Sequence, residues 1–395
     1  MQSSASQHRA SPSEPLLDPS VRSLLLVRLR VGLGDLLCTV PAVRALRAAR
    51  PDLHVALATW PEMAGVVART APWVDELVPF PGAPGIPERV PDGTLPQWQE
   101  AMAARRWDLA LQVYGDNPAA NAVTAATGAR LVGGFAATGA PGLDPALHVP
   151  YPHALHEVDR HLRLLEHLGL PPGASRALEW PLTADDLAEA ATLGLPRGAY
   201  AVLHPGATSP SRLWPVERFA EVADGLSRAG LEVVVGGVPS EAATTGAVVA
   251  ASRAPVRDLT GRTSLGAYAA LLRDAAVVVA NDTGTAHLSA AVGGRVVTVF
   301  LSGDPRRWRH AADLQAVVRE EVGCNPCPHL VCPIDHRCAR RISPDRVLRE
   351  ALLMAGLTAG LTAGSAAAPM AGPVGGTPPT PAAPSAARSA APALR

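Results

Sequence analysis

The chain has 395 residues, 48% of them hydrophobic and only 4% aromatic, and its formal net charge is zero. This length allows two domains, and cores made mainly of small aliphatic side chains suit helices packed on parallel sheets better than an aromatic-rich β-sandwich. The balanced charge argues against a nucleic-acid partner, while the lack of a long apolar run or a signal-like start predicts a cytoplasmic protein.

Apolar, β-branched runs alternate with helical stretches in both halves of the chain, which predicts an α/β protein with two doubly wound parallel sheets. The predicted strands are Ser23–Leu29, Leu53–Ala58, Glu76–Phe80, Asp108–Val113, Arg130–Gly133, Tyr200–His204, Leu231–Gly236, Val256–Leu259, Ala276–Ala280, Arg295–Leu301 and Leu314–Val318. The predicted divisions are a disordered tail at 1–20, an N-terminal Rossmann-like domain at 21–172, a linker at 173–198, a C-terminal Rossmann-like domain at 199–342, a helix at 343–357 and a disordered Ala/Pro-rich tail at 365–395.

The first predicted strand runs into a turn that presents a carboxylate. Gly32 and Gly34 permit a tight turn and close approach by a ligand, and Asp35 follows at the carboxyl end of the strand, where open α/β sheets bind ligands. A dinucleotide fingerprint would need a glycine three residues after Gly34, and Leu37 stands there instead. Asp35 is therefore a candidate site residue, and the alternative is that it caps a helix over 36–50.

Three strand ends in the second half carry polar side chains that suit a diphosphate and a ribose. The carboxyl ends of strands in one parallel sheet face one crevice, where hydroxyls, an arginine fork and helix N-terminal amides bind phosphate oxygens. After the predicted strand Ala276–Ala280, the alternative is an ordinary turn capped by Asp282 or Thr283. The candidate residues are Thr208, Ser209, Arg212, Glu241, Asp282, Thr283 and Gly284.

Three segments of the chain resemble the lipopolysaccharide heptosyltransferase family, glycosyltransferase family 9. They read GLGDLLCTVPAVRAL at 32–46, HPGATSPSRLWP at 204–215 and NDTGTAH at 281–287, and they follow the family's order and spacing over residues 23–350. The resemblance implies the GT-B fold, in which two Rossmann-like domains with parallel sheets face a central cleft.

The resemblance also implies roles for individual residues. Asp35 matches the general base on the acceptor hydroxyl, and Arg212 stands where the family has a lysine on the donor diphosphate. This chain has no lysine at all, so Arg212 keeps the charge but presents a planar fork. The remaining matches are Thr208, with Ser209 beside it, on the diphosphate, Glu241 on the ribose, Asp282 near the donor sugar, Thr283 and Gly284 in the diphosphate-binding turn, and His287 on the helix behind it.

The implied activity is an inverting, metal-independent transfer of a heptose or related sugar from a nucleotide diphosphate donor, ADP-heptose first, to a hydroxyl of a glycan or lipid-linked acceptor. The chain contains no Asp-x-Asp metal motif, and no cofactor is expected for catalysis. Alternatives are another GT-B enzyme such as a nucleotide-sugar epimerase, or an inactive nucleotide-binding scaffold, although a scaffold would have no use for Asp35. The expected location is the cytoplasm, and peripheral contact with the inner face of the plasma membrane is left open.

Four of the five cysteines crowd into a short segment near the end of the second domain. Their spacing, Cys324-x2-Cys327-x4-Cys332-x5-Cys338, supplies enough soft ligands for a structural zinc site. The spacing departs from the paired CxxC patterns, so the alternative is a loop stiffened by reduced or disulfide-linked cysteines. The basic run at 304–310 reads as a solvated loop, and the alternatives are that it borders the nucleotide site or contacts an anionic acceptor or a membrane surface.

Overall fold

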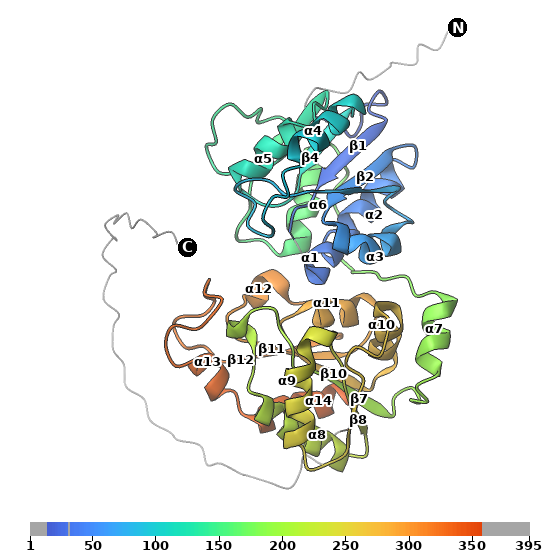
Figure 1. Cartoon of the computed structure of the whole chain (residues 1–395), viewed down its shortest axis with the longest axis vertical. Coiled ribbons are helices and arrows are strands. Elements are labelled where there is room, and N and C mark those ends of the chain that lie inside the picture. The colour runs from blue at the N-terminus through green and yellow to red at the C-terminus, as the bar shows by residue number, and fades with distance from the viewer. Residues whose placement is uncertain (1–13, 31, 358–395) are drawn as a thin grey trace. The chain divides into compact units, whose positions relative to one another are not determined.

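The computed structural model describes residues 14–30 and 32–357, which contain two six-stranded sheets (Figure 1). The strand order is β3-β2-β1-β4-β5-β6 in the first sheet and β12-β11-β10-β7-β8-β9 in the second, and the paired strands run parallel. Counted from its own first strand, each sheet has the Rossmann order 3-2-1-4-5-6, with a switch point between its first and fourth strands. Both sheets belong to one compact unit.

The first sheet is built from short apolar segments. β1 (Ser23–Val27) is a central strand that pairs with β2 and β4, so that Leu24 lies opposite Val55 and Leu109. Such strands are continuous hydrophobic runs because helices cover both faces of a parallel sheet. The other strands are β2 (His54–Thr59), β3 (Glu76–Pro79), β4 (Leu109–Gln112), β5 (Leu131–Ala136) and β6 (His148–Pro150), and the helices are α1 (Leu33–Leu37), α2 (Val40–Ala49), α3 (Ala64–Val67), α4 (Leu95–Ala104), α5 (Pro118–Ala125) and α6 (Glu157–His167).

The helix predicted over 36–50 is divided in two. α1 begins earlier than predicted, at Leu33, and α2 begins at Val40 after a break at Cys38 and Thr39. Pro41 stands in the first turn of α2, where its missing N–H costs nothing, whereas inside one long helix it would remove a hydrogen bond. Asp35 therefore lies in a short helix of its own at the end of β1.

The second sheet repeats the plan of the first. β7 (Tyr200–His204) is a central strand that pairs with β8 and β10, and only Asp282 and Thr283 separate β10 (Val277–Asn281) from α11 (Gly284–Ala291). The other strands are β8 (Glu232–Val235), β9 (Val256–Asp258), β11 (Val296–Phe300) and β12 (Gln315–Arg319), and the other helices after α6 are α7 (Ala184–Ala191), α8 (Val216–Arg228), α9 (Ala242–Ala251), α10 (Leu265–Asp274), α12 (Pro305–Trp308), α13 (Arg337–Arg341) and α14 (Pro344–Ala355).

Several predicted boundaries differ from the structure. Strand β6 was not predicted, because its three residues are too short to show a pattern. The predicted tail 1–20 is wrong at its inner end, since Leu16 is fully buried and its N–H donates to the Leu168 carbonyl oxygen. Residues 1–13 and the predicted tail 365–395 lie outside the described residues.

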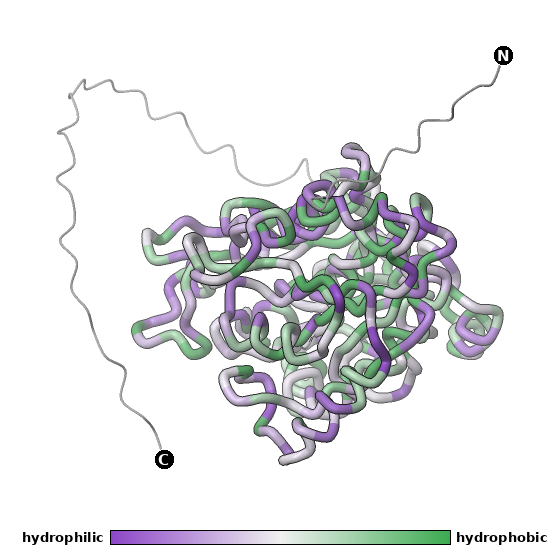
Figure 2. The backbone as a smooth tube through the Cα atoms, turned by 90° about the horizontal axis from the view of Figure 1, so that it is seen from above, coloured by the Kyte–Doolittle hydropathy of each residue, from purple (hydrophilic) through white to green (hydrophobic). Residues whose placement is uncertain are grey.

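Hydrophobic and hydrophilic segments alternate along the described chain (Figure 2). Buried apolar side chains form two clusters, and the larger one joins the first sheet to Val278 and Leu288 of the second half. In residues 14–30 and 32–357, we find no helix that combines the length and the apolar character needed to cross a membrane.

Candidate active site

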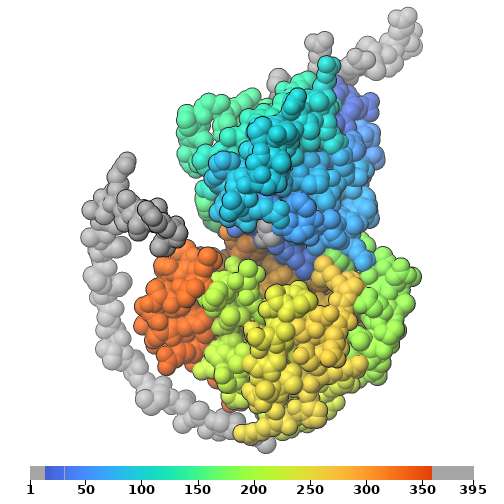
Figure 3. Space-filling model, in the orientation of Figure 1, coloured from blue at the N-terminus to red at the C-terminus, as the bar shows by residue number. Residues whose placement is uncertain are grey.

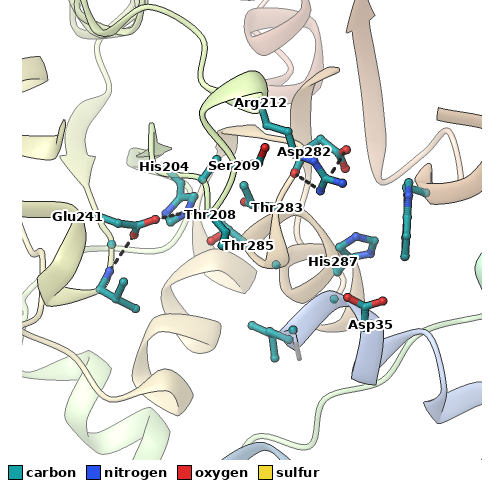
Figure 4. Close-up of a pocket in the computed structure, with 18 of the residues that line it drawn as sticks. Asp35, His204, Thr208, Ser209, Arg212, Glu241, Asp282, Thr283, Thr285 and His287 are labelled. Carbon is teal, nitrogen blue, oxygen red and sulfur yellow. Dashed lines mark hydrogen bonds and ion pairs between the residues drawn. The ribbon is translucent and has the colours of Figure 1, made fainter. Parts of the chain in front are cut away.

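A cavity of about 800 Å³ is lined by residues that follow β1 of the first sheet and β7, β8 and β10 of the second. Parallel sheets bind ligands at this edge, near the switch point. Figure 4 shows the labelled side chains around the cavity. The structure brings together every residue predicted for catalysis or donor binding, namely Asp35, Thr208, Ser209, Arg212, Glu241, Asp282, Thr283, Gly284 and His287. Their individual roles remain predictions.

The turn between β10 and α11 leaves polar atoms unpaired. Thr283 is the N-cap residue of α11, but its side chain makes no capping bond. Thr283 Oγ1 and Asp282 Oδ2 are both buried and have no hydrogen-bond partner among the described residues. The alternative of an ordinary side-chain-capped turn is therefore wrong, and the first amides of the helix remain available to an anion.

Arg212 and Asp282 form a charged pair on this side of the cavity (Figure 4). The Arg212 guanidinium donates to the Asp282 carbonyl oxygen at 3.2 Å, and its Nη1 lies 3.6 Å from Asp282 Oδ2. Burial raises the pKa of the Asp282 carboxyl to about 6, although Arg212 opposes the shift. The Arg212 side chain is still 38% exposed, so its other donors can reach a phosphate group.

Glu241 and Tyr268 line the cavity beside the end of β8. Glu241 Oε2 accepts a bond from the Val238 N–H at 3.0 Å, and Glu241 Oε1 lies 3.8 Å from His204 Nε2. The Tyr268 hydroxyl is buried without a hydrogen-bond partner in the described part of the chain. Gly236 makes this arrangement possible, because a Cβ there would lie 2.7 Å from the Tyr268 ring. Both side chains therefore offer polar atoms to a ligand.

Asp35 lies on α1 close to two arginines. Its Oδ1 is 3.3 Å from Arg28 Nη2 and 3.8 Å from Arg30 Nε. Burial raises the pKa of the Asp35 carboxyl, and the two arginines lower it. The N-cap of α1 is Gly32 and no side chain caps this helix, so the capping alternative for Asp35 is wrong. A carboxylate that lines the cavity with a raised pKa is suited to accept a proton.

Helices α1 and α11 pack directly on each other beside the cavity. A Cβ on Gly34 would overlap the His287 ring, and a Cβ on Gly284 would lie 3.1 Å from Leu33 Cβ. His287 is buried, and its Nδ1 lies 2.9 Å from His310 Nε2. Burial, and secondarily His310, lowers the pKa of His287 well below its usual value, so the imidazole is neutral near pH 7.

The basic run contributes to the cavity, which corrects its interpretation as a solvated loop. Arg307 and Trp308 line the cavity, and the Trp308 ring lies 5.6 Å from the His287 ring in a T-shaped arrangement. Only part of the run, including Arg306, is exposed. Trp308 within the run was a sign in the sequence that this segment packs against other residues of the protein. Tyr268, by contrast, is one aromatic residue inside an ordinary helix and gave no signal.

The predicted zinc site is not supported. Within residues 14–30 and 32–357, we find no group of three or more His, Cys, Asp or Glu side chains that could hold a metal ion. Cys324 and Cys332 lie in the loop before α13, whereas Cys338 is buried on that helix, and all of them are free thiols. Figure 3 shows this segment, in orange, at the surface of the molecule. Of the four clustered cysteines, Cys327 lines the cavity.

Residues 97–337 match the model of glycosyltransferase family 9 (heptosyltransferase). This span is more than half of the chain and contains all of the predicted donor-binding residues, while Asp35 lies before it. Lipopolysaccharide heptosyltransferase 3 of Escherichia coli (strain K12) is 27% identical over 168 residues, which are 41% of this chain and 48% of that protein. The chain thus spans about half the length of the curated relatives it matches.

Solved structures extend the similarity over most of the chain. A glycosyltransferase family 9 protein from Veillonella parvula is 21% identical and has a TM-score of 0.71, covering 85% of this chain and 97% of that one. Heptosyltransferase WaaC of E. coli, solved with ADP, is 20% identical and has a TM-score of 0.61, covering 84% of this chain and 99% of that one. At these identities the likeness shows the fold, which is GT-B with the cavity between two Rossmann-like domains. With its matching family model, the chain belongs to glycosyltransferase family 9.

Proposed function

We propose that this chain is an inverting glycosyltransferase that moves a heptose or a related sugar from a nucleotide diphosphate to a hydroxyl of a glycan or lipid-linked acceptor. One observation carries the proposal. A single cavity joins a carboxylate, Asp35, to an anion-binding turn at Asp282 and Thr283 that has unpaired polar atoms. The family match supports the same class of reaction.

The donor side of the cavity suits a nucleoside diphosphate sugar. The free amides at the start of α11 and the exposed part of Arg212 bind the two phosphates, and Thr208 and Ser209 add hydroxyl donors. Glu241 accepts bonds from the ribose hydroxyls. The structural neighbour solved with ADP makes ADP the first nucleotide to consider, and ADP-heptose the first donor.

The chemistry is a single displacement. Asp35 takes the proton of the acceptor hydroxyl, the oxygen attacks the anomeric carbon from one face, and the bond to the diphosphate breaks on the other, which inverts the configuration. The charge that develops on the leaving diphosphate is stabilised by Arg212 and the α11 amides. In this mechanism no metal ion takes part in the displacement.

The acceptor side belongs to the first domain. The loop after β3 is tied to the loop after β4, since the Tyr114 hydroxyl donates to Glu88 at 2.8 Å and the Asn117 side chain donates to the Gly85 carbonyl oxygen at 2.9 Å. These loops follow the carboxyl ends of the first sheet, so they are the segments that meet the acceptor. A cytoplasmic location, with contact at the inner face of the plasma membrane, remains a prediction.

Thermal denaturation with candidate donors tests the proposal. A ligand that binds the folded chain raises its melting temperature according to its concentration and affinity. We expect ADP and ADP-heptose to raise the melting temperature more than UDP-glucose or GDP-mannose at equal concentration. ADP-heptose consumption measured on the same protein separates a transferase from an inactive nucleotide-binding scaffold. Equal stabilisation by all three nucleotide classes, or none by any, would contradict the proposed donor.

A further inference from the structure

A buried glutamate, Glu157, connects the two sides of the cavity. Glu157 lies in the first turn of α6 and its side chain is 1% exposed. Its Oε2 accepts from Arg160 Nη1 at 2.7 Å and lies 2.8 Å from Arg307 Nη2, and its Oε1 lies 3.4 Å from Arg28 Nη2. Arg307 is on α12 of the second half and lines the cavity. The glutamate is thus a common partner for arginines from both domains.

Arg28 contacts two carboxylates with its guanidinium, whose Nη2 also donates to the Asp35 carbonyl oxygen at 3.2 Å. Its guanidinium is 1% exposed, and Nη1 donates to the Val113 carbonyl oxygen at 2.7 Å. Nη2 lies 3.3 Å from Asp35 Oδ1 and 3.4 Å from Glu157 Oε1. Both distances are longer than those of a charge-assisted hydrogen bond with one partner. Arg28 therefore does not close a tight ion pair on Asp35, and the Asp35 carboxylate keeps lone pairs for an acceptor hydroxyl.

The charges around Asp35 come from several elements. Arg28 and Arg30 follow β1, and Glu157 and Arg307 come from α6 and α12. Asp282 after β10, whose pKa Asp35 raises, and the neutral His287 of α11 also lie near Asp35. The buried Cys38 follows α1, and burial, Glu157 and Asp35 raise the pKa of its thiol. His161 of α6 lies 3.7 Å from Glu157 Oε1. Three arginines act on Asp35, and Glu157 is the carboxylate that opposes them there, so loss of the Glu157 charge would leave these arginines less opposed.

We propose that Glu157 is a positioning residue for the general base: by sharing Arg28 with Asp35 and binding Arg307, it keeps the base carboxylate free and ties it to the donor side. This inference rests on the proposed function in so far as Asp35 is the base. The geometry that carries it, one buried carboxylate shared by Arg28 and Arg307, is independent of the sugar transferred.

Titration of the Asp35 carboxyl group tests the proposal directly. In protein labelled with carboxyl-13C aspartate, the Asp35 signal is assigned with Asp35→Asn and followed against pH by NMR. In Glu157→Gln, we expect the Asp35 midpoint to move about 1 pH unit lower, because a carboxylate next to unopposed arginines holds its proton less tightly. Glu166→Gln, on the same helix but paired with Arg163, is the matched control and should leave the midpoint unchanged. An unchanged midpoint in Glu157→Gln would overturn the proposal.

A second variant should act in the opposite direction. Arg307→Gln removes a cation that lowers the pKa of Asp35, so the Asp35 midpoint should rise. General structural damage would not move the midpoint up in one variant and down in the other. Because Arg307→Gln leaves the Arg28 and Arg160 contacts of Glu157 in place, it also provides a test if Glu157→Gln fails to fold, and a midpoint that does not rise would then reject the proposal.

Measurements of turnover show whether the change in the Asp35 midpoint also changes the reaction rate. We expect Glu157→Gln to hydrolyse ADP-heptose about tenfold more slowly at its plateau, with the acid limb of its pH profile moved to lower pH, because a weaker base is a poorer catalyst. The Kd for ADP should stay within about twofold, since the donor contacts are untouched. If the wild-type chain neither binds ADP nor consumes ADP-heptose, the proposed function fails while the titration still decides the role of Glu157.

Discussion

The first and second sheets have the same strand order, but the polar groups at their two switch points are satisfied in different ways. Beyond β1, Asp35 and Glu157 of α6 share one buried arginine, Arg28. Beyond β10, Asp282 Oδ2 and Thr283 Oγ1 are buried without hydrogen-bond partners in the described residues. Each buried unpaired group costs about 1–3 kcal/mol. On the first side, Arg28 Nε and Arg30 Nε are also buried without hydrogen-bond partners among the described residues. The unpaired atoms are therefore guanidinium N–H donors beyond β1 and oxygens beyond β10, so a ligand can gain hydrogen bonds on both sides.

From this comparison we expect substitutions on the first side to lower turnover and substitutions on the second side to weaken donor binding. Asp35→Ala should lower turnover about 10²–10⁴-fold, because the acceptor hydroxyl loses its proton acceptor. The Kd for ADP should change little, since Asp35 lies on the other side of the cavity. Single-turnover rates with ADP-heptose and calorimetric ADP binding measure the two effects. Asp313→Ala, an exposed carboxylate, is the control, and a fully active Asp35→Ala enzyme would remove the proposed base.

A substitution on the second side should instead weaken donor binding. Arg212→Gln removes charge-assisted bonds to the diphosphate, each about 1.5–3 kcal/mol, and should weaken ADP binding by about 10–100-fold. Arg306→Gln, in which an exposed arginine outside the cavity is changed, should bind ADP like the wild type. Calorimetry on both variants makes the comparison, and equal affinities would show that Arg212 does not hold the phosphates.

A third change tests whether the two sides depend on their direct contact. Gly34→Ala places a methyl group against the buried His287 ring and should cost about 1–3 kcal/mol of unfolding free energy. Gly65→Ala is the matched control, because it is an exposed helical glycine with no atom within 4 Å of the added Cβ. Denaturant unfolding of both variants gives the difference. A Gly34→Ala protein as stable as the control would show that α1 and α11 are loosely packed.

The smallest expected effect concerns the buried carboxyl group of Asp282. Its pKa of about 6 in the folded chain lies above its usual value of 3.8, so the folded state takes up a proton between these values and stability falls as pH rises through that window. Relative to Asp282→Asn, the wild type should lose about 1 kcal/mol of unfolding free energy between pH 5 and pH 7. Equal pH slopes for both proteins would show that Asp282 is not desolvated.

Local patterns were enough to predict much of the fold and the residues that line the cavity. The run at 276–280 followed by Asp282 and Thr283 contains a strand, a turn and a helix start within a dozen residues, so one short window shows the junction. The end of β1, the turn after it and Asp35 likewise lie within one short window of the sequence. Both sheets were predicted for this reason, because each buried parallel strand is a hydrophobic run that needs no distant information.

What the sequence did not reveal depends on distant contacts. Arg28 and Glu157 are 129 residues apart, and neither belongs to a motif, although an arginine inside the apolar run 24–29 was an unused sign of a buried partner. Tyr268 meets the cavity through the packing of α10, which local periodicity does not show. The cysteine spacing would allow several geometries, and only the fold shows that Cys338 is buried on α13 while Cys324 is exposed.

The close approach of Gly34 to His287 has a consequence for how acceptor specificity could change. In the proposed mechanism, the distance from Asp35 to the donor diphosphate is set by two helices in contact, and the loops after β3 and β4 take no part in that contact. Those loops could therefore be lengthened, shortened or exchanged between relatives while the reacting groups keep their spacing. The close contact of α1 and α11 at Gly34 and Gly284 would in this way allow proteins with the same arrangement of reacting groups to use many different acceptors.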